Sequence, residues 1–437
     1  MRKSFAFAVL LALLALIVAG CRRTPEARGG PVEITVWHPW GGDQAKGLQR
    51  IVDEYHRSQN RVRVRLVYTP TDLSTNQKFF TAIAANKPPD ATFVDGTQDG
   101  QWAEWGALMP LDSFIAKGGV KPTDFYPPCW KQALYKGHIW SLAYCADPNF
   151  AFAWNKDAFR RAGLDPERPP RTIAELDAMS RKLEVMHGKR IDALGIVPWA
   201  QYGSANSLFT WGWAFGGHFY DEKTERVTAD DPRVLAALQW MVDYGNRLGI
   251  TRINGATAGW GSAAQSPFIT GQLAMTCVHI STLKEYRRYA PNMDFGIAPL
   301  PGMPNGEIGS SWIGGWSLAL PRGCKHPDAA WDFIRWVCAT DAGASAVFRD
   351  TGLLPGYRKA RVIQEVRSDP KLGMFVKILE DARHQRPTMP AQAYFMGALD
   401  RAVDNALYHK QTPEAALKQA TQETQRELDA ILGKRVR

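Results

Sequence analysis

The chain has 437 residues, with 53 basic and 43 acidic side chains and a formal net charge of +10. This length exceeds what one hydrophobic core usually supports, so two domains are expected. Basic and acidic residues are interspersed, and the densest basic run, Arg61 to Arg65, alternates with valines as in a half-buried strand. The sequence therefore favours a solvated basic face over a phosphate-binding patch, and no nucleic-acid partner is expected.

The chain opens with an export signal. An uncharged run, Phe5 to Val18, follows two basic residues and is shorter than the roughly 20 apolar residues of a transmembrane helix. It ends in Val18-Ala-Gly-Cys21, which resembles a bacterial lipobox, in which residues 1–20 are removed and Cys21 is lipidated. The alternative is an ordinary secretory signal that contains a cysteine. Both interpretations place the mature protein outside the cytoplasm, with residues 21–30 as a polar tether.

The folded part begins with alternating strands and helices. Short apolar or alternating runs predict strands at residues 32–37, 61–68 and 91–94. Apolar residues at helical spacing between these strands predict helices through residues 48–55 and 79–85. This order implies an α/β fold with a mainly parallel sheet and a ligand site at the carboxyl ends of its strands.

Helix-start signals recur further along the chain. Thr172 and Glu175 form a capping-box pattern for a helix towards Leu183, and Asp231-Pro232 begins a helix to about Leu248. Amphipathic patterns predict further helices after Pro327 and after Thr412-Pro413.

Five cysteines follow Cys21. Export permits disulfides, and the pairs closest in sequence are Cys129–Cys145 and Cys324–Cys338. An odd number leaves at least one thiol unpaired. None of the cysteines has the CxxC spacing of a zinc or redox site, so no metal and no other cofactor is expected.

Four groups of segments share the pattern of one family. They are Ile34-Thr-Val-Trp37 with Trp40-Gly-Gly; Pro88 to Asp95 with Trp105 to Leu111; Trp154-Asn-Lys-Asp-Ala-Phe159 with Ala162-Gly-Leu164 and Pro169 to Leu176; and Phe268 to Met275 with Gly314-Gly-Trp-Ser-Leu-Ala319 and Gly352-Leu-Leu-Pro355. In their order and spacing, they resemble the extracellular solute-binding proteins of ABC importers. The similarity is to the sugar-binding group that includes maltose-binding protein.

This resemblance implies a two-lobed periplasmic-binding-protein (flytrap) fold, whose discontinuous lobes are joined by hinge crossovers and close on a ligand. The crossings are expected near Tyr144–Asp147 and Gly296–Pro299. Lobe one would then comprise residues 31–144 and 299–340, and lobe two residues 148–296 and 341–437. The implied partners are a carbohydrate ligand, the permease subunits of an ABC importer, and the membrane through a lipid on Cys21.

Sixteen tryptophans give a second indication of function. A sugar site needs aromatic faces for the C–H surfaces of the ring and polar groups for its hydroxyls. Tryptophans inside amphipathic helices, such as Trp240, Trp331 and Trp336, are expected in the core. Aromatic residues in glycine-rich or irregular stretches are candidates for ligand contact, with packing as the alternative: Trp40, Trp199, Tyr202, Trp260, Trp312 and Trp316. The resemblance adds weight to Gly315-Trp316, since this motif often lines the cleft of related proteins.

Six further residues are candidates for hydroxyl recognition: Asp95, Thr97, Tyr144, Asp147, His279 and Arg358. Asp95 and Thr97 follow a strand, where an α/β sheet offers its crevice. The resemblance places Tyr144 and Asp147 at the first crossing, and an arginine offers a fork of donors. His279 follows a further predicted strand, Leu273–Val278, and a structural histidine is the alternative there. Since maltose-binding protein has acidic residues where this chain offers Trp40 and Trp199, no maltodextrin preference is implied.

Two other functions are alternatives to sugar binding. A lipid-anchored glycoside hydrolase would need two carboxylates about 5–9.5 Å apart, and Asp95 and Asp147 are a conceivable pair. No acidic residue stands in a catalytic motif, and the chain has no Gly-x-Ser-x-Gly, His-Glu-x-x-His or P-loop sequence. A binding protein rather than an enzyme is therefore expected. The same fold binding a polyamine, iron or a sugar phosphate is the other alternative, although loop tryptophans outnumber loop charges and favour a neutral sugar or polyol.

Overall fold

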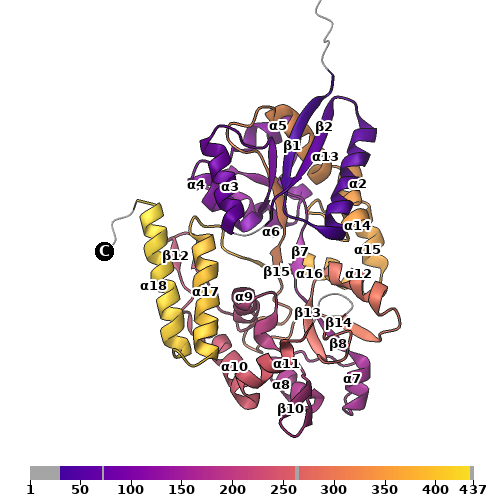
Figure 1. Cartoon of the computed structure of the whole chain (residues 1–437), viewed down its shortest axis with the longest axis vertical. Coiled ribbons are helices and arrows are strands. Elements are labelled where there is room, and N and C mark those ends of the chain that lie inside the picture. Colours follow the sequence, from indigo (N-terminus) through magenta and orange to yellow (C-terminus); the bar gives the residue numbers. More distant parts are fainter. Residues whose placement is uncertain (1–29, 71–72, 261–264, 434–437) are drawn as a thin grey trace, which may run out of the picture.

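The computed structural model describes residues 30–70, 73–260 and 265–433. They form two α/β bodies, each built around its own sheet, with a short third sheet between them (Figure 1). The predicted signal peptide, Cys21 and most of the predicted tether lie outside the described residues. In the part of the chain that is described, no helix is both long enough and apolar enough to cross a membrane.

The first sheet has the strand order β2-β1-β3-β16-β6. Its strands are β1 (Val32–His38), β2 (Val62–Tyr68), β3 (Ala91–Asp95), β6 (Ser141–Ala143) and β16 (Trp316–Ala319). β1 runs parallel to β2 and β3, as the sequence predicts, because α2 (Gly42–Ser58) crosses over between β1 and β2. β16 is antiparallel to β3 and β6, since it returns from a distant part of the chain.

Helices and short strands complete the first body. They are α3 (Leu73–Ala84), α4 (Asp99–Glu104), α5 (Asp112–Gly118), α6 (Pro127–Gln132), β4 (Leu134–Tyr135), β5 (His138–Ile139), α13 (Pro327–Ala339), α14 (Asp341–Thr351) and α15 (Val362–Ser368). α14 packs along α2, and Arg50 Nε donates to Asp350 Oδ1 at 2.7 Å. Residues 341–351 thus lie with the first sheet, whereas the expectation from the resemblance puts everything after residue 340 in lobe two.

The second sheet is antiparallel throughout, in the order β13-β8-β14. Its strands are β8 (Ala151–Asn155), β13 (Met275–Val278) and β14 (Phe295–Ala298). Around it lie α7 (Lys156–Arg161), α8 (Ile173–Leu183), β9 (Val185–His187), β10 (Arg190–Ala193), α9 (Ser204–Ala214), β11 (Tyr220–Asp221), β12 (Arg226–Val227), α10 (Pro232–Leu248), α11 (Ile250–Thr257), α12 (Ile280–Tyr289), α16 (Leu372–Asp381), α17 (Gln392–Leu407) and α18 (Pro413–Ile431).

The predicted caps of this second body form. Thr172 Oγ1 accepts from the Glu175 backbone N–H at 3.2 Å and begins α8. Asp231 Oδ1 accepts from the Arg233 N–H at 2.7 Å and begins α10. Each cap satisfies a backbone donor that the helix itself leaves open.

The third sheet, in the order β17-β15-β7, carries the chain between the two bodies. β7 (Asp147–Asn149) lies between β6 of the first sheet and β8 of the second, and β15 (Trp312–Gly314) precedes β16. The two strands are antiparallel, with Gly314 opposite Asp147. β17 (His384–Gln385) pairs in parallel with β15. The second passage thus lies later than residues 296–299, because Phe295–Ala298 pairs along β8 within the second sheet.

The cysteines of the described residues form no disulfide. Cys129, Cys145, Cys277, Cys324 and Cys338 are all free thiols, and all except Cys324 are buried. Neither of the pairs that are closest in sequence is joined. These residues pack as small apolar side chains instead.

Candidate functional site

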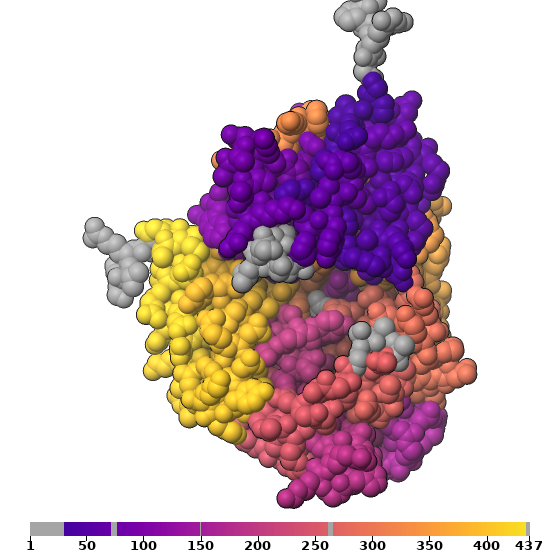
Figure 2. All heavy atoms as spheres, in the orientation of Figure 1, coloured from indigo at the N-terminus to yellow at the C-terminus, as the bar shows by residue number. Residues whose placement is uncertain are grey.

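The two bodies face one another across a hollow. Figure 2 shows it between the indigo surface of the first body and the magenta, salmon and yellow surface of the second. The candidate residues that the structure brings together come from the loop after β1, the end of β3, the third sheet, the start of β16, the loop before α9 and the start of α12.

The first body contributes a group of aromatic rings. Trp40, in the loop after β1, lies 4.5 Å from Phe93, 5.5 Å from Tyr144 and 5.7 Å from Trp316, measured between ring centroids. Trp40 and Trp316 keep part of their surface exposed, whereas Tyr144 is 1% exposed. Trp40 and Trp316 are therefore the members of this group that can meet a ligand, and Tyr144 supports them from below.

The second body contributes another aromatic group. Phe150 stacks on Tyr202 at 5.0 Å and meets Trp312 edge to face at 5.9 Å. His279 caps α12 and lies 4.0 Å from the Tyr202 ring. Tyr202 is 51% exposed and has a φ of 59°, a left-handed conformation that is uncommon for a non-glycine residue and occurs more often at functional sites. Burial lowers the pKa of His279 to about 3, so its imidazole is neutral and offers one donor and one acceptor.

Trp312 is a buried residue that supports Arg386. It is 2% exposed, and its indole Nε1 donates to Thr210 Oγ1 at 3.1 Å. The guanidinium of Arg386 lies over its ring, with Cζ 5.2 Å from the centroid. Trp312 thus forms a support for Arg386 rather than an open stacking face.

An ion pair joins the two bodies at this point. Arg386 Nη2 donates to Asp95 Oδ1 at 2.8 Å and to Oδ2 at 2.6 Å. Thr97, which is buried, donates to Asp95 Oδ1 from its backbone N–H at 3.3 Å and from its hydroxyl at 3.1 Å. The carboxylate of Asp95 is therefore already engaged, and Thr97 holds it in position.

Asp147 differs from Asp95 in having few partners. Its Oδ2 accepts a weak hydrogen bond from the Cys145 thiol at 3.9 Å, and its Oδ1 is buried. Burial raises the pKa of Asp147 to about 6; the Cys145 hydrogen bond lowers it and the charge of Asp95 raises it. Asp147 is therefore the carboxyl group at the crossing that is most open to a new hydrogen-bond donor.

Gly315 is required by the conformation of the backbone and by its close approach to Cys145. Its φ is 134°, and a Cβ at this position would lie 2.3 Å from the Cys145 carbonyl oxygen. Only glycine fits this close approach between the two crossings. Its contribution is to place β15 and Trp316.

Three candidates lie apart from these groups. Trp199 is 9% exposed and packs edge to face on Tyr244, so its surroundings match the packing alternative. Trp260 follows α11 and packs partly on the core of the second body. Arg358 is exposed and its Nε donates to the Thr123 carbonyl at 2.9 Å, which ties two loops of the chain together. We therefore do not retain Arg358 as a ligand residue.

Two residues of the site were missed from the sequence. Arg386 stands in a short irregular segment with no motif, and its partner Asp95 lies 291 residues earlier. Phe150 immediately precedes β8, and an apolar residue next to a buried strand is expected in the core. Phe150 is linked to the site by its stacking on Tyr202 and Arg386 by its bond to Asp95, and both contacts form only in the folded chain.

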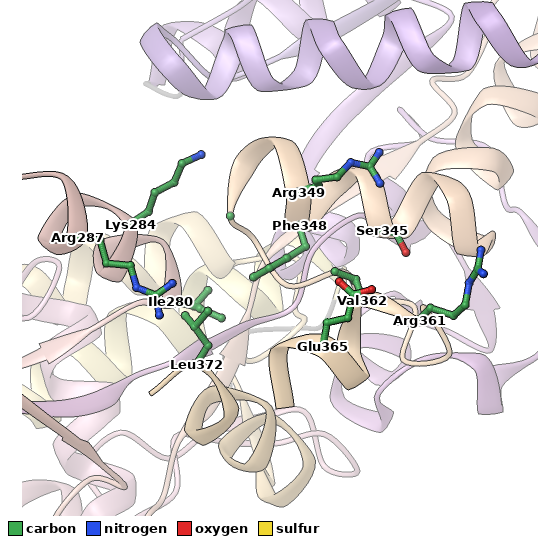
Figure 3. A pocket seen from close by; sticks show the side chains of 11 residues that line it. Ile280, Lys284, Arg287, Ser345, Phe348, Arg349, Arg361, Val362, Glu365 and Leu372 are labelled. Atoms are coloured by element: carbon green, nitrogen blue, oxygen red, sulfur yellow. The ribbon is translucent and has the colours of Figure 1, made fainter. Parts of the chain in front are cut away.

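A separate cavity of about 510 Å³ lies between α12, α14, α15 and α16 (Figure 3). Ile280, Phe348, Val362 and Leu372 give it apolar walls, and four cations lie around them. Three of these cations are already paired with carboxylates: Arg287 with Asp369 at 2.7 Å, Arg349 with Glu54 at 2.6 Å and Arg361 with Asp341 at 2.6 Å. Phe348 is the one aromatic ring among the residues that line this cavity, whereas the candidate residues at the third sheet include several.

Comparison with known proteins agrees with this arrangement. The family described as "Bacterial extracellular solute-binding protein" matches residues 50–374. The maltotriose-binding protein of Pyrococcus abyssi is 26% identical over 393 residues, which cover 88% of this chain and 79% of that protein. An sn-glycerol-3-phosphate-binding periplasmic protein of Pectobacterium atrosepticum is 22% identical over 89% of this chain and 90% of its own length.

Solved structures give the same result. A protein described as "CpMnBP1 with Mannobiose Bound" superposes with a TM-score of 0.79 at 29% identity, covering 90% of this chain and 99% of that one. The cyclic alpha-maltosyl-1,6-maltose binding protein of Arthrobacter globiformis has a TM-score of 0.73 at 25% identity, covering 92% of this chain and all of that one. The expected two-lobed α/β fold is confirmed, and the chain belongs to the bacterial extracellular solute-binding proteins.

Proposed function

We propose that this protein is the substrate-binding component of an ABC importer and that it captures a neutral carbohydrate between its two lobes. The observation that carries this proposal is the placement of partly exposed aromatic rings from both bodies, Trp40 and Trp316 from one and Tyr202 from the other, around the third sheet. Such rings suit the C–H faces of sugars. The relatives named for maltotriose and mannobiose support the same ligand class.

The charges of the site favour an uncharged ligand. The positive charge of Arg386 is compensated by Asp95, so it offers little net attraction to a phosphate. A polyamine would need several free carboxylates, and here Asp95 is paired while Asp147 has a raised pKa. The glycerol-phosphate-binding relatives make a sugar phosphate the second candidate.

Lobe closure would couple binding to transport. Only a ligand that contacts both lobes favours the closed state, and the candidate residues come from both. We place the lobe boundary so that α13 and α14 stay with the first lobe, with β7 and β15 as crossings. The closed form would then be recognised by the permease subunits. Lipid on Cys21, with residues 21–30 as tether, would hold the receptor at the membrane.

We also propose that the protein is not an enzyme. Asp95 and Asp147 are the conceivable acid–base pair, and Asp95 is held by Arg386 and Thr97. Incubation with labelled oligosaccharides tests this directly. Any turnover above that of a Trp316→Ala variant would contradict it.

The binding proposal is tested by calorimetry of the purified mature protein. The ligands are mannobiose, mannotriose, maltotriose, sn-glycerol 3-phosphate and spermidine. We expect binding of at least one saccharide, and a loss of at least tenfold in affinity for Trp316→Ala without unfolding. Trp105→Ala is the matched control, since Trp105 is 50% exposed and packs on Phe80 rather than on Trp40 or Trp316. Binding of glycerol phosphate or spermidine alone would overturn the choice of ligand.

A further inference from the structure

The third sheet sets two charged residues on either side of a glycine. Gly314 lies opposite Asp147 on β7, and its neighbour Ile313 lies beside Gln385 on β17. Arg386 directly follows Gln385, at the end of β17. Residues side by side across neighbouring strands point to the same face, and adjacent strands are about 4.8 Å apart. Asp147 and Arg386 therefore lie on opposite sides of β15, whose residue Gly314 carries no side chain.

Both residues hold a polar atom without a partner. Arg386 Nε and Asp147 Oδ1 are buried, and within residues 30–70, 73–260 and 265–433 neither has a hydrogen-bond partner. Buried polar atoms in folded proteins nearly always form a hydrogen bond, so each of these two unpaired atoms needs an explanation. One of the two atoms is a donor and the other is an acceptor.

The rest of the Arg386 side chain is fixed. Nη2 is held by Asp95, and the guanidinium plane rests over Trp312. The side chain is 11% exposed. The Nε–H is therefore presented in one direction by a rigid group, which makes it suited to recognition rather than to long-range attraction.

We propose that Arg386 Nε–H donates a hydrogen bond to one hydroxyl group of the bound carbohydrate and that Asp147 Oδ1 accepts one from the neighbouring hydroxyl group. This inference rests on the proposed function and names the residues that would set its specificity. A hydroxyl group can fill either role, so a pair of adjacent hydroxyls satisfies both orphan atoms at once. A site built to pair a hydroxyl rejects the analogue that lacks it, because its own buried atoms are then left open.

Substitutions separate this role from simple packing. Arg386→Lys keeps a cation for Asp95 but removes the Nε–H, and Asp147→Leu removes the acceptor at similar size. Arg383→Lys is the matched control on the same segment, because Arg383 is exposed. Asp147→Asn serves as the second variant, should Asp147→Leu not fold as judged by circular dichroism.

The probes are the saccharide that binds the wild type and its monodeoxy derivatives. We expect Arg386→Lys and Asp147→Leu each to weaken binding of the parent saccharide at least tenfold, with Arg383→Lys unchanged. Each variant should also lose discrimination against one deoxy position only, and these two positions should be adjacent on the ring. Where Asp147→Asn takes the place of Asp147→Leu, we expect a smaller loss confined to the same position.

Two results would overturn the inference while leaving the proposed function intact. The first is that both variants bind the parent saccharide within twofold of the wild type, as expected if ordered water satisfies the two atoms. The second is that each variant loses the same affinity for every deoxy derivative. If the wild type binds no saccharide, the proposed function itself is refuted and the inference falls with it.

Discussion

Asp147→Asn tests whether the first crossing holds a carboxyl group that is costly to ionise. Burial raises the pKa of Asp147 from 3.8 to about 6, the Cys145 thiol lowers it, and the charge of Asp95 raises it. One pKa unit corresponds to about 1.36 kcal/mol, so the difference between the two values corresponds to about 3 kcal/mol. Asparagine has nearly the same size and carries no ionisable proton.

The direction of the pH dependence follows from whether the folded or the unfolded protein binds the proton of Asp147 more tightly. The folded protein keeps the proton of Asp147 to higher pH than the unfolded chain does. The stability that this group contributes is therefore fully present below about pH 4 and is lost as the pH rises through about 6. The Asp147→Asn variant lacks this loss, so its stability relative to the wild type should rise by roughly 3 kcal/mol between about pH 4 and pH 7.5.

Urea unfolding at these two pH values, followed by tryptophan fluorescence and circular dichroism, measures the difference. Asp230→Asn is the control, because Asp230 is exposed and should give the same small difference at both values. The reasoning would be refuted if the free-energy difference between wild type and Asp147→Asn did not depend on pH, or if it fell as the pH rose.

Three further outcomes follow from contacts elsewhere. Gly315→Ala should lower the free energy of unfolding by more than about 2 kcal/mol, because its Cβ would meet a carbonyl oxygen at 2.3 Å. Gly255→Ala, in α11 with open space around it, should be neutral to slightly stabilising in thermal melts, because alanine favours a helix over glycine. Arg247→Met should lower the free energy of unfolding in urea by about 3 kcal/mol, since Glu184 loses two hydrogen bonds of 2.6 Å and its side chain is only 9% exposed. The double variant Arg247→Met/Glu184→Gln should recover most of this loss, because it also removes the buried charge. No recovery would contradict the assignment of the loss to an unpaired buried charge. Titration with a thiol reagent, on a chain that begins after Cys21, should find five thiols in the denatured protein and Cys324 alone in the native protein; fewer than five in the denatured protein would mean a disulfide.

Local structure was largely readable from the sequence. The parallel pairing of β1, β2 and β3 follows from apolar runs separated by an amphipathic helix, and Thr172 and Asp231 begin their helices as expected. Each of these signals acts over a few residues. The antiparallel placement of β16 and the packing of α14 on α2 depend on contacts between segments about 200 to 300 residues apart, and no local pattern records them.

The site was predicted in part for the same reason. Trp40, Tyr202 and Trp316 stood out because an indole or phenol in a glycine-rich loop is hard to place in a core, and in the structure each of them keeps part of its surface exposed. Trp199 occurs in an equally irregular stretch but packs on Tyr244. Loop composition alone cannot distinguish these two outcomes, because burial depends on what the rest of the chain lays over the loop.

The sequence by itself determined the α/β class, several of the longer helices and strands, and the resemblance to solute-binding proteins, since periodicity, capping residues and motif order are local properties. Only the tertiary structure decided that Asp95 is held by Arg386 and that Asp147 is left with an open acceptor. Hydrogen-bond partners and burial fix the charge and the pKa of such groups, and both arise only when distant segments meet at the third sheet.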